Sequence, residues 1–409
     1  MIDLVKSKGN GGARPIPKFC RPLLRVSALL LPYSFYSLLG FLALSLVLVW
    51  HRGQRHVDPL TRGTLGVAMA LLLSSCIMAA DRGEALLQLA NFLPFFLLFV
   101  GLPALTRHLD VAQRLQRDLV LASLPISLAA LVEYLLKSPY LPVALQQWPW
   151  VEALRVAPHR GRPMVMFDHP NVLASYLVIV FGLAWGLLTQ AGDGKASAGQ
   201  PSRVGLAPVL ALTLAAIAAT SSRNGLAVAL LQAAIGLSVL RLPWLVKGGI
   251  LAGLSGVGFG LAALSLGASR WSPAALLEDP RAGLWKIALD LIAERPWLGW
   301  GLGSFKQLYP PRLIDPDYIS VFHPHNVGLL LAVEAGIGAA IALTLLVSFI
   351  IYRSLTARSA PRGLWIGINL ALVGVVGFAC FDVTLYDGRL NALGWVMLAC
   401  AYGMARPIQ

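Results

Sequence analysis

Charged residues are scarce in this sequence. Lys, Arg, Asp and Glu make up 13% of its 409 residues, whereas about a quarter of a soluble globular chain is charged. Hydrophobic residues make up 57%, and the mean hydropathy is +0.70. Water cannot be the main solvent of such a chain, so the composition excludes an ordinary soluble enzyme. It indicates a single bundle of membrane-spanning helices, whose size follows from the number of spans.

Cysteines and acidic residues are also few. The four cysteines have no CxxC or metal-ligand spacing, which argues against a disulfide framework. Asp and Glu number 19 against 33 Lys and Arg, giving a formal net charge of +14. In a soluble protein this excess would suggest nucleic acid, but the basic residues lie mostly in short loops between apolar runs, and no nucleic-acid motif accompanies them. We therefore expect no nucleic-acid partner, and interpret the charge as membrane topology, attraction to lipids or an anionic ligand.

Long apolar runs are what the sequence has in abundance. A helix needs about 20 residues to cross the roughly 30 Å hydrocarbon core of a membrane, and most of the runs approach this length. The runs lie near residues 27–50, 64–80, 89–105, 118–136, 171–190, 205–220, 224–240, 248–266, 326–352, 363–381 and 390–405.

The loops between these runs alternate in charge. The short loops of one set carry few basic residues, namely Arg82, Arg223 and Arg389, whereas the loops of the other set are rich in Lys and Arg. By the positive-inside rule, the basic set is cytoplasmic and the other set faces the opposite side. The basic loops are those at 51–63, 106–117, 191–204, 241–247 and 353–362.

The first apolar run is expected to fold back on itself. The basic N-terminal tail and the first basic loop both belong in the cytoplasm, yet a single run separates them. Splitting the run at 27–50, which contains Pro32 and Gly40, into a hairpin of two short helices resolves the conflict and gives about twelve segments with both termini inside. We thus expect a cytoplasmic tail over 1–26, without a removable signal peptide, and one transmembrane helical domain over 27–409.

Two long segments, 137–170 and 267–325, are expected on the side away from the cytoplasm. The second is rich in proline and holds an apolar-rich helical stretch at 281–293, which we expect to lie along the membrane surface.

Polar residues with chemical potential gather on that same side. If their arginines converge, they would bind a phosphate or pyrophosphate, because planar guanidinium groups match phosphoryl oxygens and keep their charge when partly desolvated. A histidine beside them would suit proton abstraction near neutral pH. These are the parts needed for attack by a hydroxyl on a carbon that bears a pyrophosphate leaving group. The four clusters are Arg160 and Arg162 before Asp168-His169-Pro170-Asn171, then Ser221-Ser222-Arg223-Asn224, then Arg281 with Lys286, and finally His323-Pro324-His325-Asn326 with Glu334.

Each arginine and histidine also has an ordinary structural interpretation. Arg223 opens a helix at a membrane interface, where arginines commonly snorkel. Arg160 and Arg162 lie in a long loop, where a solvated surface role fits as well as ligand binding. The His323 and His325 pair resembles metal ligands, but no third ligand stands at a telling spacing, so we expect no metal.

Helix capping is the ordinary role for Asp168, Asn171 and Asn326, because each lies at the expected start of a helix. Glu334 differs, since it lies eight residues into an apolar run and intramembrane carboxylates usually face an interior partner. We expect it to position a histidine or to pair with an arginine. Three charged residues on a short loop fit an interfacial ion pair better than catalysis, and these are Asp382, Asp387 and Arg389.

Three stretches share an order and a spacing with one known family. A Thr-Ser-Ser-Arg-Asn-Gly turn at 220–225 opens an apolar run, and an Arg, Trp and Ala pattern at 281–288 precedes a Gly- and Trp-rich stretch at 296–305. His325 is followed by a small polar residue, nine further positions and then Gly336. These stretches resemble the O-antigen ligases, which belong with the O-antigen polymerases and pilin-glycosylating ligases in one superfamily of membrane glycosyltransferases.

The resemblance extends over about 160–340, because the stretch at 167–174 also looks like a family segment that leads into a span. One position departs from the ligase signature, which prefers Gly, Thr or Val where this chain has Ala339.

The resemblance implies a GT-C-like, all-α polytopic protein of the bacterial inner (cytoplasmic) membrane, with about twelve transmembrane helices, a large periplasmic loop and an active site facing the periplasm. It implies an inverting, metal-independent transfer, without a cofactor, of glycan from undecaprenyl pyrophosphate to a hydroxyl of the lipid A-core oligosaccharide in lipopolysaccharide biosynthesis. By the same likeness, His325 would be the general base, while Arg223 and Arg281 would hold the pyrophosphate. Further candidates for substrate binding are Arg160, His323, His169, Asn171, Asn326 and Glu334.

Two other functions stay open. An O-antigen polymerase would use the same donor but a second carrier-linked glycan as acceptor. A transporter of lipid-linked glycan would need ionisable or broken-helix positions near the membrane midplane and an inverted repeat, and the sequence shows neither clearly.

Overall fold

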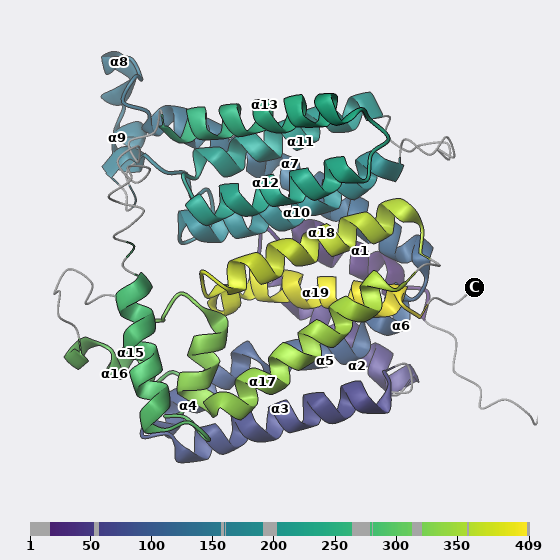
Figure 1. The fold of residues 1–409 in the computed structure, drawn as a ribbon, viewed down its shortest axis with the longest axis vertical. Coiled ribbons are helices and arrows are strands. Elements are labelled where there is room, and N and C mark those ends of the chain that lie inside the picture. The colour runs from purple at the N-terminus through teal and green to yellow at the C-terminus, as the bar shows by residue number, and fades with distance from the viewer. Residues whose placement is uncertain are drawn as a thin grey trace, which may run out of the picture.

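The computed structural model describes residues 17–52, 57–156, 159, 161–190, 203–263, 279, 281–312, 321–357 and 360–406, and all regular structure within them is helical. Figure 1 shows most of the helices lying side by side with similar axis directions, while α15 (Arg281–Glu294) crosses one end of the bundle. The all-helical fold expected from the sequence is confirmed. The chain forms α1 (Cys20–Leu30), α2 (Ser37–Arg52), α3 (Pro59–Met78), α4 (Arg82–Gln88), η1 (Leu89–Asn91), α5 (Leu93–Gly101), α6 (Pro103–Thr106), α7 (Leu109–Lys137), α8 (Val143–Gln146), α9 (Pro149–Val156), α10 (Pro170–Gln190), α11 (Arg203–Ala219), α12 (Arg223–Ser238), α13 (Trp244–Ala263), α15, α16 (Phe305–Leu308), η3 (Pro310–Arg312), α17 (Val327–Leu355), α18 (Arg362–Ala379), η5 (Thr384–Tyr386) and α19 (Gly388–Met404).

In the described part of the chain, seven stretches of helix are long and apolar enough to cross a membrane, and two shorter apolar helices accompany them. This confirms a multi-pass membrane protein, while the number of twelve spans and the orientation of the bundle stay predictions. The seven are Pro59–Met78, Arg82–Thr106, Leu109–Lys137, Pro170–Gln190, Trp244–Leu261, Val327–Leu355 and Arg362–Ala379, and the shorter two are Ser37–His51 and Gly205–Ala219.

The first apolar run is divided into two helices, as expected. The chain turns between α1 and α2, and the two helices pack against each other. However, α1 begins at Cys20, inside the stretch expected as a tail, and both Cys20 and Leu24 are buried. Hydropathy alone missed this beginning because α1 is amphipathic, with arginines beside the buried residues of its first turns.

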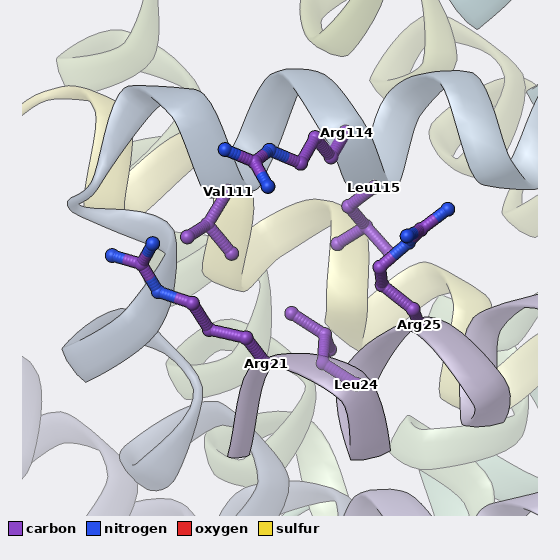
Figure 2. A pocket seen from close by; sticks show the side chains of 6 residues that line it. All are labelled: Arg21, Leu24, Arg25, Val111, Arg114 and Leu115. Carbon is purple, nitrogen blue, oxygen red and sulfur yellow. The ribbon is translucent and has the colours of Figure 1, made fainter. Parts of the chain in front are cut away.

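Those arginines attach α1 to the start of α7. Arg25 forms an ion pair with the buried Asp118 at 2.7 Å, while Arg21 and Arg114 both reach Asp110, at 3.4 and 3.3 Å. Figure 2 shows the three arginines around a small apolar pocket between the two helices. These contacts hold the N-terminal helix pair to the bundle.

The centre of the bundle is the close contact between α10 and α18. Gly182 and Gly186 of α10 lie against the backbone of α18, and a Cβ at Gly182 would come within 2.6 Å of the Leu370 carbonyl carbon. Gln232 of α12 joins the pair, since its amide donates to the carbonyls of Val178 and Leu370 at 3.1 and 2.7 Å. The first residues of α10 and the loop after α18 are therefore held on one rigid unit.

The two ends of the bundle carry different groups. At the end where α17 and α19 finish, Asp58 accepts a hydrogen bond from Tyr402 at 2.6 Å and pairs with Arg406 and Arg353 at 3.3 and 3.8 Å. This basic end gathers the loops that the positive-inside rule assigns to the cytoplasm. At the opposite end, where α17 begins and α18 finishes, lie His325 and Asp382.

Helix α17 is interrupted near its start. Gly336 has φ 85° and ψ 162°, a conformation that favours glycine, and a Cβ there would collide with the carbonyl oxygen of Trp297. The Gly- and Trp-rich stretch occupies this break: Trp300 and Gly301 donate backbone hydrogen bonds to the carbonyls of Val333 and Glu334, both at 2.9 Å. The Gly- and Trp-rich stretch and the stretch from His325 to Gly336, which both resemble the family, thus pack together at the break in α17.

Candidate active site

His325 stands at the site end of the bundle, just before α17. Its backbone has φ 51°, in the left-handed region, so the chain changes direction sharply at this residue. Asn326 then caps α17, because its Oδ1 accepts a hydrogen bond from the Leu329 amide at 2.9 Å, and its Nδ2 donates to the Cys380 carbonyl at 3.0 Å. The expected capping role of Asn326 is confirmed, and both ends of its side chain are engaged by protein.

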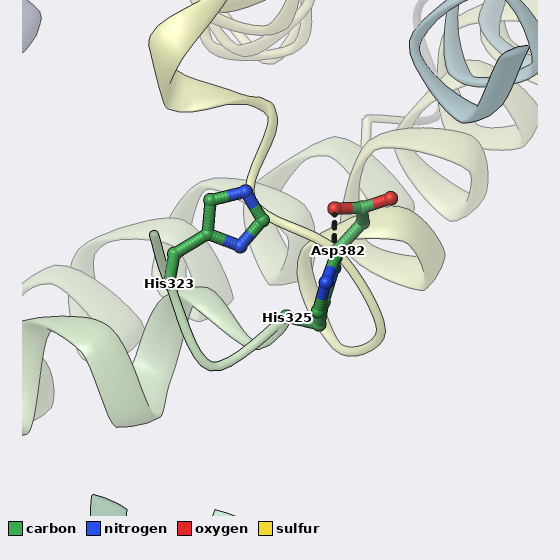
Figure 3. A group of neighbouring side chains, drawn as sticks. All are labelled: His323, His325 and Asp382. Atoms are coloured by element: carbon green, nitrogen blue, oxygen red, sulfur yellow. Dashed lines mark hydrogen bonds and ion pairs between the residues drawn. The ribbon is translucent and has the colours of Figure 1, made fainter. Parts of the chain in front are cut away.

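His325 forms a dyad with Asp382, from the loop after α18. The Nδ1 of His325 lies 3.0 Å from Oδ1 of Asp382 (Figure 3). Burial pushes the pKa of Asp382 upward, but the hydrogen bond and charge of His325, together with His323, hold that pKa below its ordinary value. The ionised carboxylate can only accept hydrogen bonds, so Nδ1 of His325 carries the proton. In the neutral ring this leaves Nε2 as the basic nitrogen.

Asp382 was expected in an ion pair with its loop neighbours, and for Asp382 that expectation is wrong. Asp387 and Arg389 do pair, at 2.6 Å, and the Arg389 guanidinium covers the Phe167 ring at 4.3 Å. Asp382 instead accepts from the Val383 amide and from Asn171 Nδ2, at 2.8 and 3.1 Å. The direction of its side chain depends on how α18 packs on α10, which charge and hydropathy do not encode.

His323 lies beside the dyad. Its ring meets the His325 ring edge-on, with centroids 4.5 Å apart, and stacks on Tyr386. Burial, and then the charge of His325, lower the pKa of His323 to about 4, so His323 is neutral near pH 7. Its buried Nδ1 has no hydrogen-bond partner among the described residues. His323 is therefore placed to adjust the environment of His325.

The two histidines and Asp382 could together hold a metal ion, because their ligand atoms lie within 4.8 Å of one another. Asp382 is the third ligand that the sequence spacing of His323 and His325 lacked. The hydrogen bond between His325 and Asp382 already engages one possible ligand atom of each of these two residues. Metal independence stays a prediction.

Asn171 and His169 lie behind the dyad. Asn171 is buried, and its amide is engaged at both ends, since Oδ1 accepts from Arg162 at 2.9 Å and Nδ2 donates to Asp382. It therefore does not cap α10 through its side chain, and the capping role expected for Asn171 is wrong. His169 Nδ1 accepts the Asn171 backbone amide at 3.0 Å, and burial together with His159 lowers the pKa of His169 to about 3. Both residues face protein groups here, and substrate binding by either stays a prediction.

Arg162 is buried, with 4% of its surface exposed, so the solvated role considered for it is wrong. Besides Asn171, it reaches the Thr220 carbonyl, to which its Nε donates at 2.7 Å. The ammonium of Lys137 in turn donates to the Arg162 carbonyl at 3.0 Å. Arg160, its neighbour in the sequence, lies outside the described residues.

Arg223 and Arg281 converge on one carboxylate. The turn before α12 has Ser221 at φ 50°, and Ser222 caps the helix by accepting the Gly225 amide at 3.2 Å. This turn sets Arg223 so that its Nη2 lies 2.8 Å from Oδ2 of Asp279, while Arg281 Nη1 lies 3.2 Å from the same oxygen. The structure thus brings together the two arginines that the sequence analysis selected. They share the Asp279 carboxylate, which the sequence analysis did not select.

The start of α15 is also tied to the histidine loop. The indole N–H of Trp285, one turn after Arg281, donates to the Pro324 carbonyl at 2.9 Å, between His323 and His325. Helix α15 packs on α17 through Leu284, Ala288 and Leu291, which are all buried. The predicted helix at 281–293 is confirmed, and it ties the segment that carries Arg281 to the loop that carries His325.

Among the described residues, Glu334 neither positions a histidine nor pairs with an arginine. Its Oε1 accepts the Phe305 amide at 3.2 Å, so the carboxylate closes the Gly- and Trp-rich stretch onto the break in α17. Its own carbonyl accepts from Ser75 of α3 at 2.6 Å. Loop amides replaced the expected side-chain partners because the kink at Gly336 turns this part of α17 toward the loop. A role for Glu334 in substrate binding stays a prediction.

The comparison with known families can be set against this geometry. Residues 208–344 match the family model described as O-antigen ligase. The chain carries an O-antigen ligase region. The resemblance seen in the motifs is thereby confirmed, and the region includes the arginine turn, α15 and the His325 to Gly336 pattern. No curated protein matches the chain.

The O-antigen ligase region leaves out part of the site. Asn171 and Arg162 precede it, and Asp382 follows it, so the family match alone does not point to them. The complete arrangement holds a histidine with a free basic nitrogen, a carboxylate that orients it, and two guanidinium groups on a common anion. These groups can remove a proton from a hydroxyl and neutralise a phosphorylated leaving group.

Proposed function

We propose that this protein is a glycosyltransferase that moves O-antigen glycan from undecaprenyl pyrophosphate to a hydroxyl of the lipid A-core oligosaccharide. The reaction would take place at the periplasmic face of the inner membrane, with inversion and without a metal. The observation that carries the proposal is the meeting of the His325 and Asp382 dyad with the Arg223 and Arg281 pair at one end of the bundle. The O-antigen ligase region supports the glycan-transfer class.

The chemistry follows from the roles these groups can fill. Nε2 of His325 takes the proton of the acceptor hydroxyl while its oxygen attacks the anomeric carbon. The bond from that carbon to the pyrophosphate oxygen breaks, and the electron pair leaves with undecaprenyl pyrophosphate. Attack from the side opposite the leaving group inverts the anomeric centre. Asp382 stabilises the imidazolium that forms, and the arginines stabilise the charge on the leaving group.

An apolar cavity supports a donor with a long hydrocarbon chain. The cavity has a volume of about 340 Å³ and lies among α10, α17, α18 and α19. It is lined near the site by Asn326 and Cys380, and toward the basic end by Val347 and Ile351. At 1.5 Å per residue, the stretch from Asn326 to Ile351 spans at most roughly 38 Å, because α17 is broken at Gly336, and this is comparable with the thickness of a membrane core. A polyprenyl chain placed there would bring its pyrophosphate to the site end.

A transporter fits these observations less well. Its ionisable residues should lie near the middle of the bundle, whereas the dyad and the arginine pair lie at one end. An O-antigen polymerase would use the same donor and the same groups, and would differ in its acceptor.

One experiment tests the proposal and its acceptor together. The purified protein is reconstituted with undecaprenyl-pyrophosphate-linked glycan, with chelator present, and is offered lipid A-core and a second carrier-linked glycan in competition. We expect glycan on the lipid A-core, and no transfer by a folded His325→Ala variant. Product on the carrier-linked glycan would replace the ligase assignment with a polymerase. Transfer by His325→Ala at the wild-type rate would overturn the base assignment.

A further inference from the structure

A chain of buried hydrogen bonds joins the base to the turn that carries Arg223. It starts at His325, passes through Asp382 and Asn171, and reaches Arg162, with successive distances of 3.0, 3.1 and 2.9 Å. From Arg162 it continues to the Thr220 carbonyl at 2.7 Å. Thr220 lies three residues before Arg223, in the turn between α11 and α12. The four side chains come from three segments far apart in the sequence, since Arg162 and Asn171 share one segment.

We infer that Arg162 and Asn171 are positioning residues that hold the His325 base in register with the Arg223 turn. This inference rests on the proposed function, because it assigns the two residues to the same reaction. Neither is placed to touch substrate: both are buried, and the interactions described above direct their polar atoms at other protein groups.

Arg162 determines which way the Asn171 amide points. A guanidinium group has only donors, so it requires the carbonyl oxygen of Asn171 to face it. The NH₂ group is then directed at Oδ2 of Asp382. Asp382 accepts on both oxygens, as its ionised form can, and an ionised carboxylate requires the proton on Nδ1 of His325 for the hydrogen bond between them. The chain of hydrogen bonds that begins at Arg162 therefore fixes the tautomer of His325.

The Nε of Arg162 holds the turn that carries Arg223 in place. Thr220 follows the end of α11, where carbonyl groups lack helical partners, and the Arg162 guanidinium satisfies one of them. Arg162 is itself held by Lys137, which pairs with Glu133 at 2.7 Å. Glu133 accepts the amides of Met164 and Val165 at 3.1 and 2.6 Å. The whole segment is anchored on α7.

The first test is the steady-state kinetics of Arg162→Lys in the reconstituted transfer assay. A lysine ammonium cannot span both Thr220 and Asn171 as the planar fork does, so the base and the arginine turn lose their register. We expect the turnover number to fall about 10- to 100-fold and the donor KM to rise. Arg155→Lys is the matched control, because Arg155 also donates to carbonyls at a helix end, those of Leu136 and Ser138, but contacts neither the dyad nor the arginines. Equal kinetics for the two variants would overturn the inference.

The second test is Asn171→Asp, which keeps the shape of the side chain. An aspartate at 171 would face Arg162, His169 and Asp382, with His325 beyond Asp382. Ionised, it cannot donate to Asp382, whereas protonated it can donate its O–H. The turnover number relative to wild type should therefore be about 10-fold reduced at high pH and should recover as pH falls. A ratio that does not change with pH would overturn the inference.

A spectroscopic measurement separates this inference from the proposed function. The ¹⁵N chemical shifts of His325 in the full-length protein, assigned by comparison with His325→Ala, report its tautomer without any substrate. We expect the Nδ1-protonated form in wild type and in Arg155→Lys, and mixed tautomers in Arg162→Lys. An unchanged tautomer in Arg162→Lys would contradict the inference. If the expected shifts appear but the wild type transfers no glycan, the positioning role of Arg162 and Asn171 stands and the proposed function fails.

Discussion

The base dyad and the arginine pair are built in opposite ways. His325 and Asp382 bond to each other, and Asp382 is held from behind by the Asn171 side chain and the Val383 amide, so that every partner of Asp382 described above is a donor. Arg223 and Arg281 instead meet at one carboxylate oxygen of Asp279. The base is thus preorganised by the fold, while the arginines carry a counter-ion where an anionic substrate group would bind. A rigidly held base favours proton transfer, whereas arginines whose counter-ion can be replaced favour the binding of an anionic group.

The sharpest way to break this contrast is Asp382→Asn. An asparagine amide can present its NH₂ to Nδ1 of His325, which favours the wrong tautomer, and it cannot stabilise the imidazolium. We expect the turnover number to fall about 10²- to 10⁴-fold with a nearly unchanged donor KM. Asp387→Asn is the matched control, because Asp387 lies on the same loop but pairs with Arg389. If both variants lose activity equally, the loop rather than the dyad is responsible.

Conservative changes in the arginine pair should affect binding more than turnover. In Arg223→Lys and Arg281→Lys, an ammonium replaces the planar fork that bonds two phosphoryl oxygens at once. We expect the donor KM to rise about 10-fold in each variant. Arg295→Lys provides the comparison, since Arg295 is near the other end of α15 and its guanidinium covers the Trp300 ring at 4.0 Å. Unchanged donor KM in both pair variants would remove the pyrophosphate role.

The sequence predicted the elements of this site better than their contacts. The apolar runs at 171–190 and 363–381 nearly coincide with α10 and α18, because long uncharged runs carry a strong signal. Helix α1 began earlier than its run, since an amphipathic helix attached by Arg25 is not uniformly apolar. Element boundaries set by composition alone are therefore shifted wherever ion pairs hold a helix.

The contacts of the site depend on residues far apart in the chain. His325 and Asp382 are separated by 57 residues, and Asn171 and Asp382 by 211. No local pattern encodes such a pair, so Asp382 looked like a surface charge and Arg162 like a loop arginine. The motif that did identify Arg223, Arg281 and His325 was the likeness to O-antigen ligases, confirmed over 208–344. The signal for Asp382 in the sequence is its charge between two apolar neighbours, Phe381 and Val383.

The smallest expected effect concerns Asp279, and it has the opposite sign. If the Asp279 carboxylate occupies the place of a donor phosphate, Asp279→Asn removes the negative charge that the two arginines share, at little structural cost. The donor KM should then fall about threefold, since the interaction lost is a partly exposed ion pair with modest energy. Inorganic pyrophosphate should inhibit the variant at a correspondingly lower concentration, with the turnover number unchanged. A rise in KM would mean that Asp279 holds the arginines in place for the donor, so that the pair, like the dyad, is preorganised by the fold.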